Sequence, residues 1–308
     1  MDRAKSGSGV RKIKDDLVGH IYIGAWRIVR WLPERTAYDL FYKGADLLVK
    51  RDGKSVQRLR SNLTRVRPEL TVQEMDALMV EAMRSYMRYW CDTFRFPDWT
   101  QQRTMSSVVV TNEHLLMDAI AAKTGVIVAL PHAGNWDHAG AYFCNKGVKL
   151  VTVAERLKPE ALFNKFLAYR ESIGMEVLAL DGRVIATLAA RLRAGGLVAL
   201  VADRDLSRTG ITVKFFDGHA RMPAGPAVLA LNTGARLLSA YVSYTPTGIH
   251  IDFELVDVPV DGDKETRILS LVQQCADHFA RGIASAPQDW HMLQRIWVDA
   301  DFKERTDA

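Results

Sequence analysis

The stretch Gly125-Val-Ile-Val-Ala-Leu-Pro-His-Ala-Gly-Asn-Trp-Asp-His-Ala-Gly-Ala-Tyr-Phe143 predicts the local architecture around which the chain is organised. Its apolar run Val126–Leu130 is rich in β-branched residues, which is typical of a fully buried strand. Pro131 ends that strand because it has no backbone N–H to donate to a neighbour. Gly134 then permits a tight turn. The stretch therefore predicts a buried strand that ends abruptly in a turn.

A helix is predicted to follow the turn, and it places two ionisable residues close together. Asn135 or Asp137 can cap this helix, which continues through Tyr142. His132 at the strand end and Asp137 at the helix start are separated by four residues. Catalytic and binding groups in open α/β sheets lie at the carboxyl ends of the strands. We therefore predict that His132 and Asp137 are catalytic.

The chemistry of this pair follows from its residue types. A His that acts as a general base must present one ring nitrogen as an acceptor, and a carboxylate fixes the proton on the other nitrogen. The short turn predicts that Asp137 folds back on His132 to do so. The sequence places no Ser or Cys nucleophile beside the pair and contains no Gly-x-Ser-x-Gly elbow. We therefore predict direct attack by a substrate hydroxyl, without a covalent enzyme intermediate.

Composition limits the class of protein. The 308 residues are 48% hydrophobic, enough for a sizeable core, and no apolar run approaches the roughly 18 residues of a spanning helix. The N-terminus has no secretory signal pattern. Cys91, Cys144 and Cys275 are odd in number and far apart, which predicts reduced thiols in the cytosol and no metal site. No P-loop or Gly-x-Gly-x-x-Gly motif is present, so we expect no cofactor.

Positive charge is concentrated at the N-terminus. Residues 1–70 contain sixteen Lys or Arg and eight Asp or Glu, an excess of +8, whereas the whole chain carries +5. Aromatic residues such as Trp26 and Trp31 are interleaved with these charges, a pattern that suits an anionic phospholipid surface. A solvated basic face is the alternative. Nucleic acid is not expected as a partner, because no helix-turn-helix, zinc-finger or RNP signature accompanies the charge.

The order of predicted elements gives the fold class. We expect residues 1–14 to be disordered, 15–100 to form amphipathic, membrane-facing helices, and 101–308 to form the catalytic core, continuous with the helices as one domain. Strands and helices alternate after His132, and residues 237–256 read as a hairpin. The fold class is therefore α/β, with a mixed, largely parallel central sheet flanked by helices and an N-terminal helical region.

Further charged residues are predicted near the ends of the other strands. Asp203 and Arg204 follow a buried strand, so they can orient an acceptor hydroxyl or grip a phosphate; a structural ion pair is the alternative. Arg221 lies in a predicted loop, 217–224, just before a helix, where phosphate binding is favoured. Glu155 follows the strand Leu150–Ala154 and is a further candidate on the same edge.

With these residues identified, the chain resembles a known family. His132-Ala-Gly-Asn-Trp-Asp137 is similar to the His-x4-Asp signature of the bacterial acyltransferases related to the lipid A lauroyl and myristoyl transferases. The resemblance is closer to the actinobacterial phosphatidylinositol mannoside acyltransferases, and it covers nearly the whole chain. The strings that carry it are Ala154-Glu-Arg-Leu-Lys-Pro-Glu160, Tyr169-Arg-Glu-Ser172, Arg221-Met-Pro-Ala-Gly-Pro226 and Asp289-Trp-His-Met-Leu-Gln294.

The resemblance implies a specific reaction. Members of this family transfer a fatty acyl group, typically palmitoyl, from acyl-CoA to a mannose hydroxyl of phosphatidylinositol mannosides at the cytosolic face of the plasma membrane, without a metal. It implies that His132 is the general base and Asp137 its partner, and that Arg170 binds substrate. Glu155 and Asp203 fall where the family has further active-site carboxylates. Position 203 is usually Glu there, so a direct contact can become water-mediated here.

Other functions remain open on the sequence. One is a lipid A-type transferase that uses acyl-carrier protein as its donor. Another is a non-catalytic, lipid-binding membrane protein, for which the basic N-terminal helices would suffice. A thioesterase is also conceivable, because the same His132 could activate water.

Overall fold

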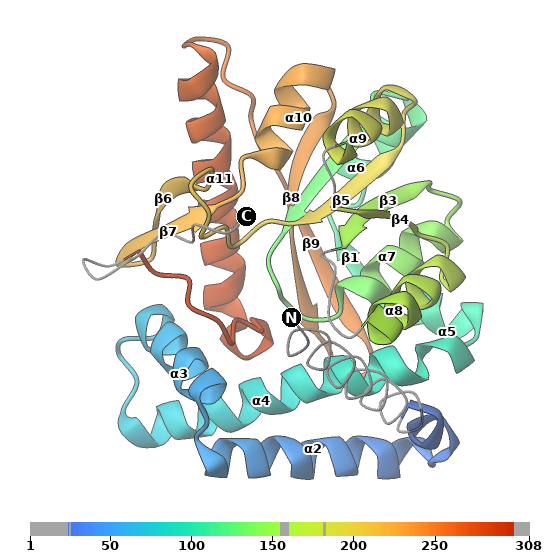
Figure 1. The fold of residues 1–308 in the computed structure, drawn as a ribbon, viewed down its shortest axis with the longest axis vertical. Helices are drawn as coiled ribbons and strands as arrows, with labels where there is room; N and C mark the ends of the chain where they lie inside the picture. Colours follow the sequence, from blue (N-terminus) through green and yellow to red (C-terminus); the bar gives the residue numbers. More distant parts are fainter. Residues whose placement is uncertain (1–23, 25, 155–159, 181–182, 299–308) are drawn as a thin grey trace, which may run out of the picture.

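The computed structural model describes residues 24, 26–154, 160–180 and 183–298 (Figure 1). A seven-stranded sheet with the order β1-β9-β8-β2-β5-β3-β4 forms its centre. Only β8 and β9 pair in an antiparallel sense, and the other five neighbouring pairs are parallel. The predicted α/β class with a largely parallel sheet is therefore confirmed. The strands are β1 Val108–Thr111, β2 Val126–Leu130, β3 Leu150–Ala154, β4 Glu176–Ala179, β5 Leu197–Val201, β8 Arg236–Tyr244 and β9 Ile249–Leu255.

Helices cover both faces of this sheet. One face packs against α9 (Val184–Arg193), α10 (Gly225–Thr233) and α11 (Lys264–Ser285), and the other against α6 (His114–Ala121) and α7 (Trp136–Asn145). Along β2 the alternation of side chains decides the partner: Ile127 and Ala129 join the first cluster, and Val126, Val128 and Leu130 join the second. The short helix α5 (Gln101–Ser106) and the longer α8 (Glu160–Ser172) complete this layer.

The N-terminal helices share a core with the sheet. They are α2 (Glu34–Arg51), α3 (Lys54–Val66) and α4 (Val72–Arg95), and they lie across one end of the sheet in Figure 1. Leu59 and Leu63 of α3 and Met79 of α4 belong to the same hydrophobic cluster as Ile127 of the sheet. Of the helix expected within residues 15–33, only residues 24 and 26–31 are described as helical, and the basic segment 1–14 lies outside the described residues.

One predicted loop is a strand. Residues 217–224 were expected to be irregular, but β7 (Gly218–Met222) pairs in an antiparallel sense with β6 (Ile211–Phe215). The burial of alternate residues, Ala220 and Met222, is the period of a strand. Gly218 at the first position of β7 and Pro223 directly after it hid this short alternation in the sequence. The edge strand β1 was also not predicted.

No described helix is both long enough and apolar enough to cross a bilayer. The exposed surface nevertheless includes large apolar side chains on the N-terminal helices. Trp31 is 91% exposed, Leu40 is 54% exposed and Leu47 is 47% exposed.

The sequence Thr71-Val-Gln-Glu74 forms a capping box at the start of α4 and gives a test of this part of the fold. The hydroxyl oxygen of Thr71 accepts from the backbone N–H of Glu74 (3.3 Å), and the carboxylate of Glu74 accepts from the backbone N–H of Thr71 (2.8 Å). We expect Thr71→Ala to lower the free energy of unfolding by about 1 kcal/mol, measured by urea denaturation. The matched change Thr64→Ala, on the exposed side of α3, should stay within about 0.5 kcal/mol. Equal effects of the two changes would contradict a role for the cap.

Candidate active site

The turn that follows β2 positions His132. Gly134 adopts a φ of +56°, and a Cβ atom there would collide with the backbone oxygen of Val242. The side chain of Asn135 then caps α7 by accepting from the backbone N–H of His138 at 2.9 Å. The predicted strand, turn and cap are confirmed, and they leave the side chain of His132 41% exposed at the carboxyl end of β2.

Asp203 is the carboxylate that holds His132. The Nδ1 atom of His132 lies 2.6 Å from Oδ1 of Asp203, and the backbone N–H of His132 donates to Oδ2 at 3.0 Å. The indole N–H of Trp290 donates to the same Oδ2 at 3.0 Å. Asp203 follows β5, which pairs in parallel with β2, so the two strand ends meet at one edge of the sheet.

This arrangement defines the protonation of the pair. Burial by itself raises the pKa of Asp203, but the charge and the hydrogen bonds of His132, with that of Trp290, outweigh it and hold the pKa below its ordinary value. Asp203 is therefore an ionised acceptor, and the proton on the imidazole belongs on Nδ1. Nε2 is then the ring nitrogen that can accept a proton from a hydroxyl, as a general base requires.

Asp137 has different partners from those predicted. Its carboxylate accepts from Nε of Arg170 at 2.9 Å and from the hydroxyl of Tyr89 at 3.0 Å. Asp137 lies in the first turn of α7, where its side chain points toward α4 and α8 rather than back toward His132. The prediction that Asp137 orients His132 is therefore wrong, and Asp203 has that role. Asp137 instead links α7 to α4 and α8 through these two hydrogen bonds.

Asp203, which the sequence predicts as a substrate-binding residue, is buried in the structure. Its exposed fraction is 0%, and both carboxylate oxygens are bonded within the protein. Its side chain reaches His132 directly. In the structure Asp203 thus contacts the exposed part of the site through His132.

The other predicted substrate-binding residues lie in three places. Arg170 lies on α8 beside Asp137; burial alone lowers the pKa of its guanidinium, but the ion pair with Asp137 raises it above the ordinary value. Arg204 directly follows Asp203 and is half-buried. Arg221 is on β7 rather than in a loop, and its backbone oxygen accepts from the N–H of Asp205, which brings β7 next to the segment after β5. Glu155 lies outside the described residues.

A C-terminal segment completes the site, and sequence patterns alone did not reveal its role. The backbone oxygen of Asp289 accepts from the N–H of Gly134 at 2.9 Å, and the N–H of His291 donates to the oxygen of His132 at 2.7 Å. Together with the indole of Trp290, these bonds hold the turn from one side. The string Asp289–Gln294 stood out only through the family resemblance.

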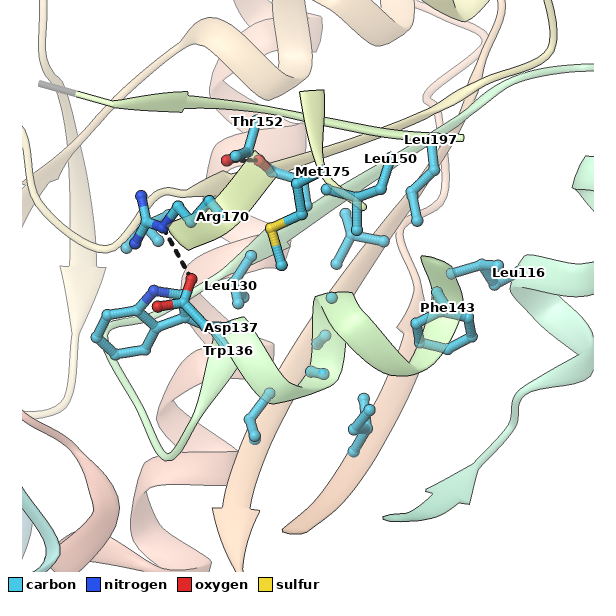
Figure 2. Close-up of a pocket in the computed structure, with 18 of the residues that line it drawn as sticks. Leu116, Leu130, Trp136, Asp137, Phe143, Leu150, Thr152, Arg170, Met175 and Leu197 are labelled. Carbon is cyan, nitrogen blue, oxygen red and sulfur yellow. Dashed lines mark hydrogen bonds and ion pairs between the residues drawn. The ribbon is translucent and has the colours of Figure 1, made fainter. Parts of the chain in front are cut away.

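An apolar pocket opens beside this centre, between α7 and the sheet. It encloses about 660 Å³ of space free of protein atoms, including solvent at its mouth. Its polar lining residues are Asp137, Thr152 and Arg170, and the rest of the lining is apolar or aromatic. Trp136 lines the pocket, and its ring centroid lies 5.9 Å from that of His132. Figure 2 shows Trp136, Asp137 and Arg170 grouped at one end, with Leu116 and Phe143 at the other.

Among the described residues, no group of three or more His, Cys, Asp or Glu side chains could hold a metal ion. The ionisable groups that the described site offers are the imidazole of His132, the buried carboxylate of Asp203 and the guanidinium of Arg170. A buried carboxylate, an imidazole and an apolar pocket suit the transfer of a hydrophobic acyl group to a hydroxyl.

Comparison with known proteins decides the family. The family model for bacterial lipid A biosynthesis acyltransferases matches residues 9–299. The chain belongs to this family.

Relatives in this acyltransferase family are similar over almost their full length. A phosphatidylinositol mannoside acyltransferase of Mycobacterium tuberculosis (strain ATCC 25618 / H37Rv) is 40% identical over 289 residues, which cover 92% of this chain and 89% of the relative. Another phosphatidylinositol mannoside acyltransferase, from Mycolicibacterium smegmatis, is 39% identical over 290 residues, 93% of each chain. The protein is an acyltransferase, and the predicted resemblance is confirmed.

Two buried histidines near the site of this acyltransferase predict how its stability depends on pH. Burial lowers the pKa of His138 to about 4; burial, followed by the nearby charge of His132, lowers the pKa of His291 to about 3. In the unfolded chain both would take up a proton near pH 6.5. The unfolded state thus binds more protons between these values, so stability falls as pH decreases below about 6.5, by about 1.4 kcal/mol per pH unit for each histidine.

We expect His138→Gln to remove one histidine's share of this slope. The measurement is the free energy of unfolding in urea at several pH values between neutral and mildly acidic. His114→Gln, at an exposed position on α6, is the matched control and should leave the slope unchanged. A His138→Gln variant with the same pH slope as the wild type would show that His138 is not held neutral in the folded protein.

Proposed function

We propose that this acyltransferase moves a long-chain acyl group, palmitoyl, from acyl-CoA to a mannose hydroxyl of a phosphatidylinositol mono- or dimannoside. The names of the mycobacterial relatives support this acceptor. The observation that carries the proposal is the hydrogen-bonded pair of His132 and Asp203 beside an apolar pocket. An acyl chain needs an apolar site, and the hydroxyl that forms the new ester bond needs a base to take its proton. No cofactor takes part, and acyl-CoA is a co-substrate.

The proposed mechanism is direct transfer. Nε2 of His132 removes the proton from the mannose hydroxyl as its oxygen attacks the thioester carbonyl carbon. The tetrahedral intermediate collapses, the carbon–sulfur bond breaks, and the leaving CoA sulfur takes the proton back from the imidazolium. Asp203 stabilises the imidazolium while it is charged, as a buried carboxylate does in other His-based sites.

We assign to Arg170 the stabilisation of the negative charge that develops on the carbonyl oxygen in the tetrahedral intermediate. Arg170 lines the pocket near Trp136, and Asp137 holds its Nε atom, which fixes the plane of the guanidinium (Figure 2). A fixed donor aimed at developing negative charge typically contributes about 10²–10³ in rate. We assign Arg204 and Arg221 to the phosphates of the donor, and Glu155 stays a prediction for the acceptor.

The same proposal places the protein at the cytoplasmic face of the plasma membrane as a peripheral protein. Leu40, Lys43 and Leu47 follow one another at intervals of three and four on α2, so they share one exposed face of that helix. Trp31 precedes this face and is almost fully exposed. Apolar side chains that alternate with basic ones suit the interface of an anionic bilayer. We call Trp31, Leu40, Lys43 and Leu47 the α2 surface.

Mass spectrometry of lipid products tests the reaction. Protein incubated with palmitoyl-CoA and a mono- or dimannosylated phosphatidylinositol should yield a product heavier by one palmitoyl group. We expect His132→Ala to abolish this product, and Asp203→Asn to lower the rate by about 10²–10⁴, because an amide can stabilise the wrong tautomer and not the imidazolium. His114→Ala, at an exposed position on α6, is the control and should keep full activity.

The outcomes separate the alternatives. Full activity of His132→Ala would overturn the mechanism. Transfer only from acylated acyl-carrier protein would favour a lipid A-type donor. Binding of the glycolipid by wild-type protein with no product from either donor would favour a non-catalytic lipid-binding protein.

Vesicle binding tests the α2 surface. We expect the double change Leu40→Ser and Leu47→Ser to weaken co-sedimentation with vesicles that contain phosphatidylinositol by at least about tenfold, because two half-exposed leucines lose their burial in the bilayer. Val260→Ser, at a 90% exposed apolar position before α11, is the matched control and should bind like the wild type. Unchanged binding by the double variant would show that α2 does not contact the membrane.

A further inference from the structure

The pocket is divided near its middle by one side chain. Figure 2 shows that the side chain of Met175 extends into the middle of the pocket. Arg170 and Asp137 lie at one end of the pocket, and Leu116 and Phe143 lie at the other. Met175 lies directly before β4, and its backbone N–H donates to the oxygen of Arg170 at 3.1 Å. Met175, which narrows the pocket, is therefore hydrogen-bonded to Arg170, which lies at the polar end of the pocket.

The wall opposite Met175 has no side chain. Gly140 lies on α7 and lines the pocket, as do Trp136, Asp137 and Phe143 of the same helix. A Cβ atom built on Gly140 would collide with the terminal methyl of Met175 and lie 3.4 Å from Cδ1 of Leu150. A glycine inside a helix costs roughly 0.5–1 kcal/mol relative to alanine. The position thus gives up helix stability and lets the terminal methyl of Met175 lie directly against α7.

We propose that Gly140 and Met175 form the constriction that determines which acyl-chain lengths this enzyme accepts. The inference rests on the proposed function, because it assigns the pocket to the acyl chain of the donor. In the structure the methyl of Met175 lies over Gly140 and narrows the pocket, and Gly140 leaves room for a chain to pass once that methyl swings aside. Methionine is unbranched and flexible, so it can swing aside for a long chain and close the space behind a short one.

The position of the constriction sets the lengths that it separates. Gly140 is four residues beyond Trp136, or about 6 Å along the helix axis at its usual rise. Carbon–carbon bonds of about 1.5 Å in a zigzag cover that distance in roughly five bonds. An octanoyl chain, with seven bonds, therefore ends roughly two bonds beyond the constriction, whereas a palmitoyl chain, with fifteen bonds, extends far past it.

Donor chain length is the readout of the first test. We would measure transfer from acyl-CoA donors of increasing length, and binding of the matching non-hydrolysable thioethers. Gly140→Ala should lower binding and transfer with palmitoyl donors by at least about tenfold, since each methylene that loses its burial costs about fourfold in affinity. Octanoyl donors should be used as well as by the wild type. Alanine is a better helix former than glycine, so the variant should fold.

A matched control and a rescue separate this role from general damage. Gly44→Ala makes the same change inside α2, where the new Cβ would lie 3.6 Å from the methyl of Met87, an ordinary contact. It should leave the chain-length profile unchanged. Adding Met175→Ala to Gly140→Ala removes the group that the new methyl meets and should restore palmitoyl use. A purely structural defect at Gly140 would not be repaired by deleting a second side chain.

Each outcome bears on one of the two proposals. If Gly140→Ala lowers octanoyl and palmitoyl donors equally, or the double variant does not recover, the constriction does not determine chain length. If Gly140→Ala does not fold, the single variant Met175→Ala tests the constriction. It should raise the preference for palmitoyl-CoA over octanoyl-CoA, and an unchanged preference would overturn the inference. If the wild type transfers no acyl group, the proposed function fails, and the thioether binding profile still tests the constriction.

Discussion

The structure depends on one buried carboxylate. Asp203 has no exposed surface, so its charge must be compensated inside the protein, and His132 and Trp290 compensate it with three hydrogen bonds. Leaving a buried charge without its partners costs about 3–5 kcal/mol. The segments after β2 and β5 and the C-terminal segment are therefore held in one arrangement, and this arrangement also keeps an imidazole nitrogen ready to accept a proton.

The two faces of the sheet serve different purposes because strand side chains alternate. Ile127 and Ala129 pack into the cluster shared with α9, α10 and α11, which is filled with side chains. On the other face, Val128 and Leu130 line the pocket between the sheet and α7. Unfilled apolar space costs stability, because the atoms around it lose contacts. The filled face and the shared N-terminal core offset that cost, and the open face is available for an apolar ligand.

Much of the fold could be predicted because its signals are local. Val126–Leu130 is apolar throughout, Pro131 and Gly134 interrupt the chain, and Asn135 has a side chain that can cap a helix; each property acts within a few residues. The same is true of the capping box at Thr71. The hairpin strand Gly218–Met222 was missed because it is only five residues long, begins with a glycine and is followed by a proline. Its pairing with β6 outweighed those local signals.

By itself the sequence determined the β2–α7 unit, the place of His132 at its turn and the largely parallel sheet, since these follow from periodicity and caps. Only the tertiary structure decided which carboxylate holds that histidine. Asp137 is closer along the chain, but the first turn of α7 directs it to Arg170 and Tyr89. Asp203 is 71 residues away, and parallel pairing of β2 with β5 brings it to His132. Sequence distance could not reveal this contact, because parallel neighbours are separated by a crossover whose length is not fixed by local patterns.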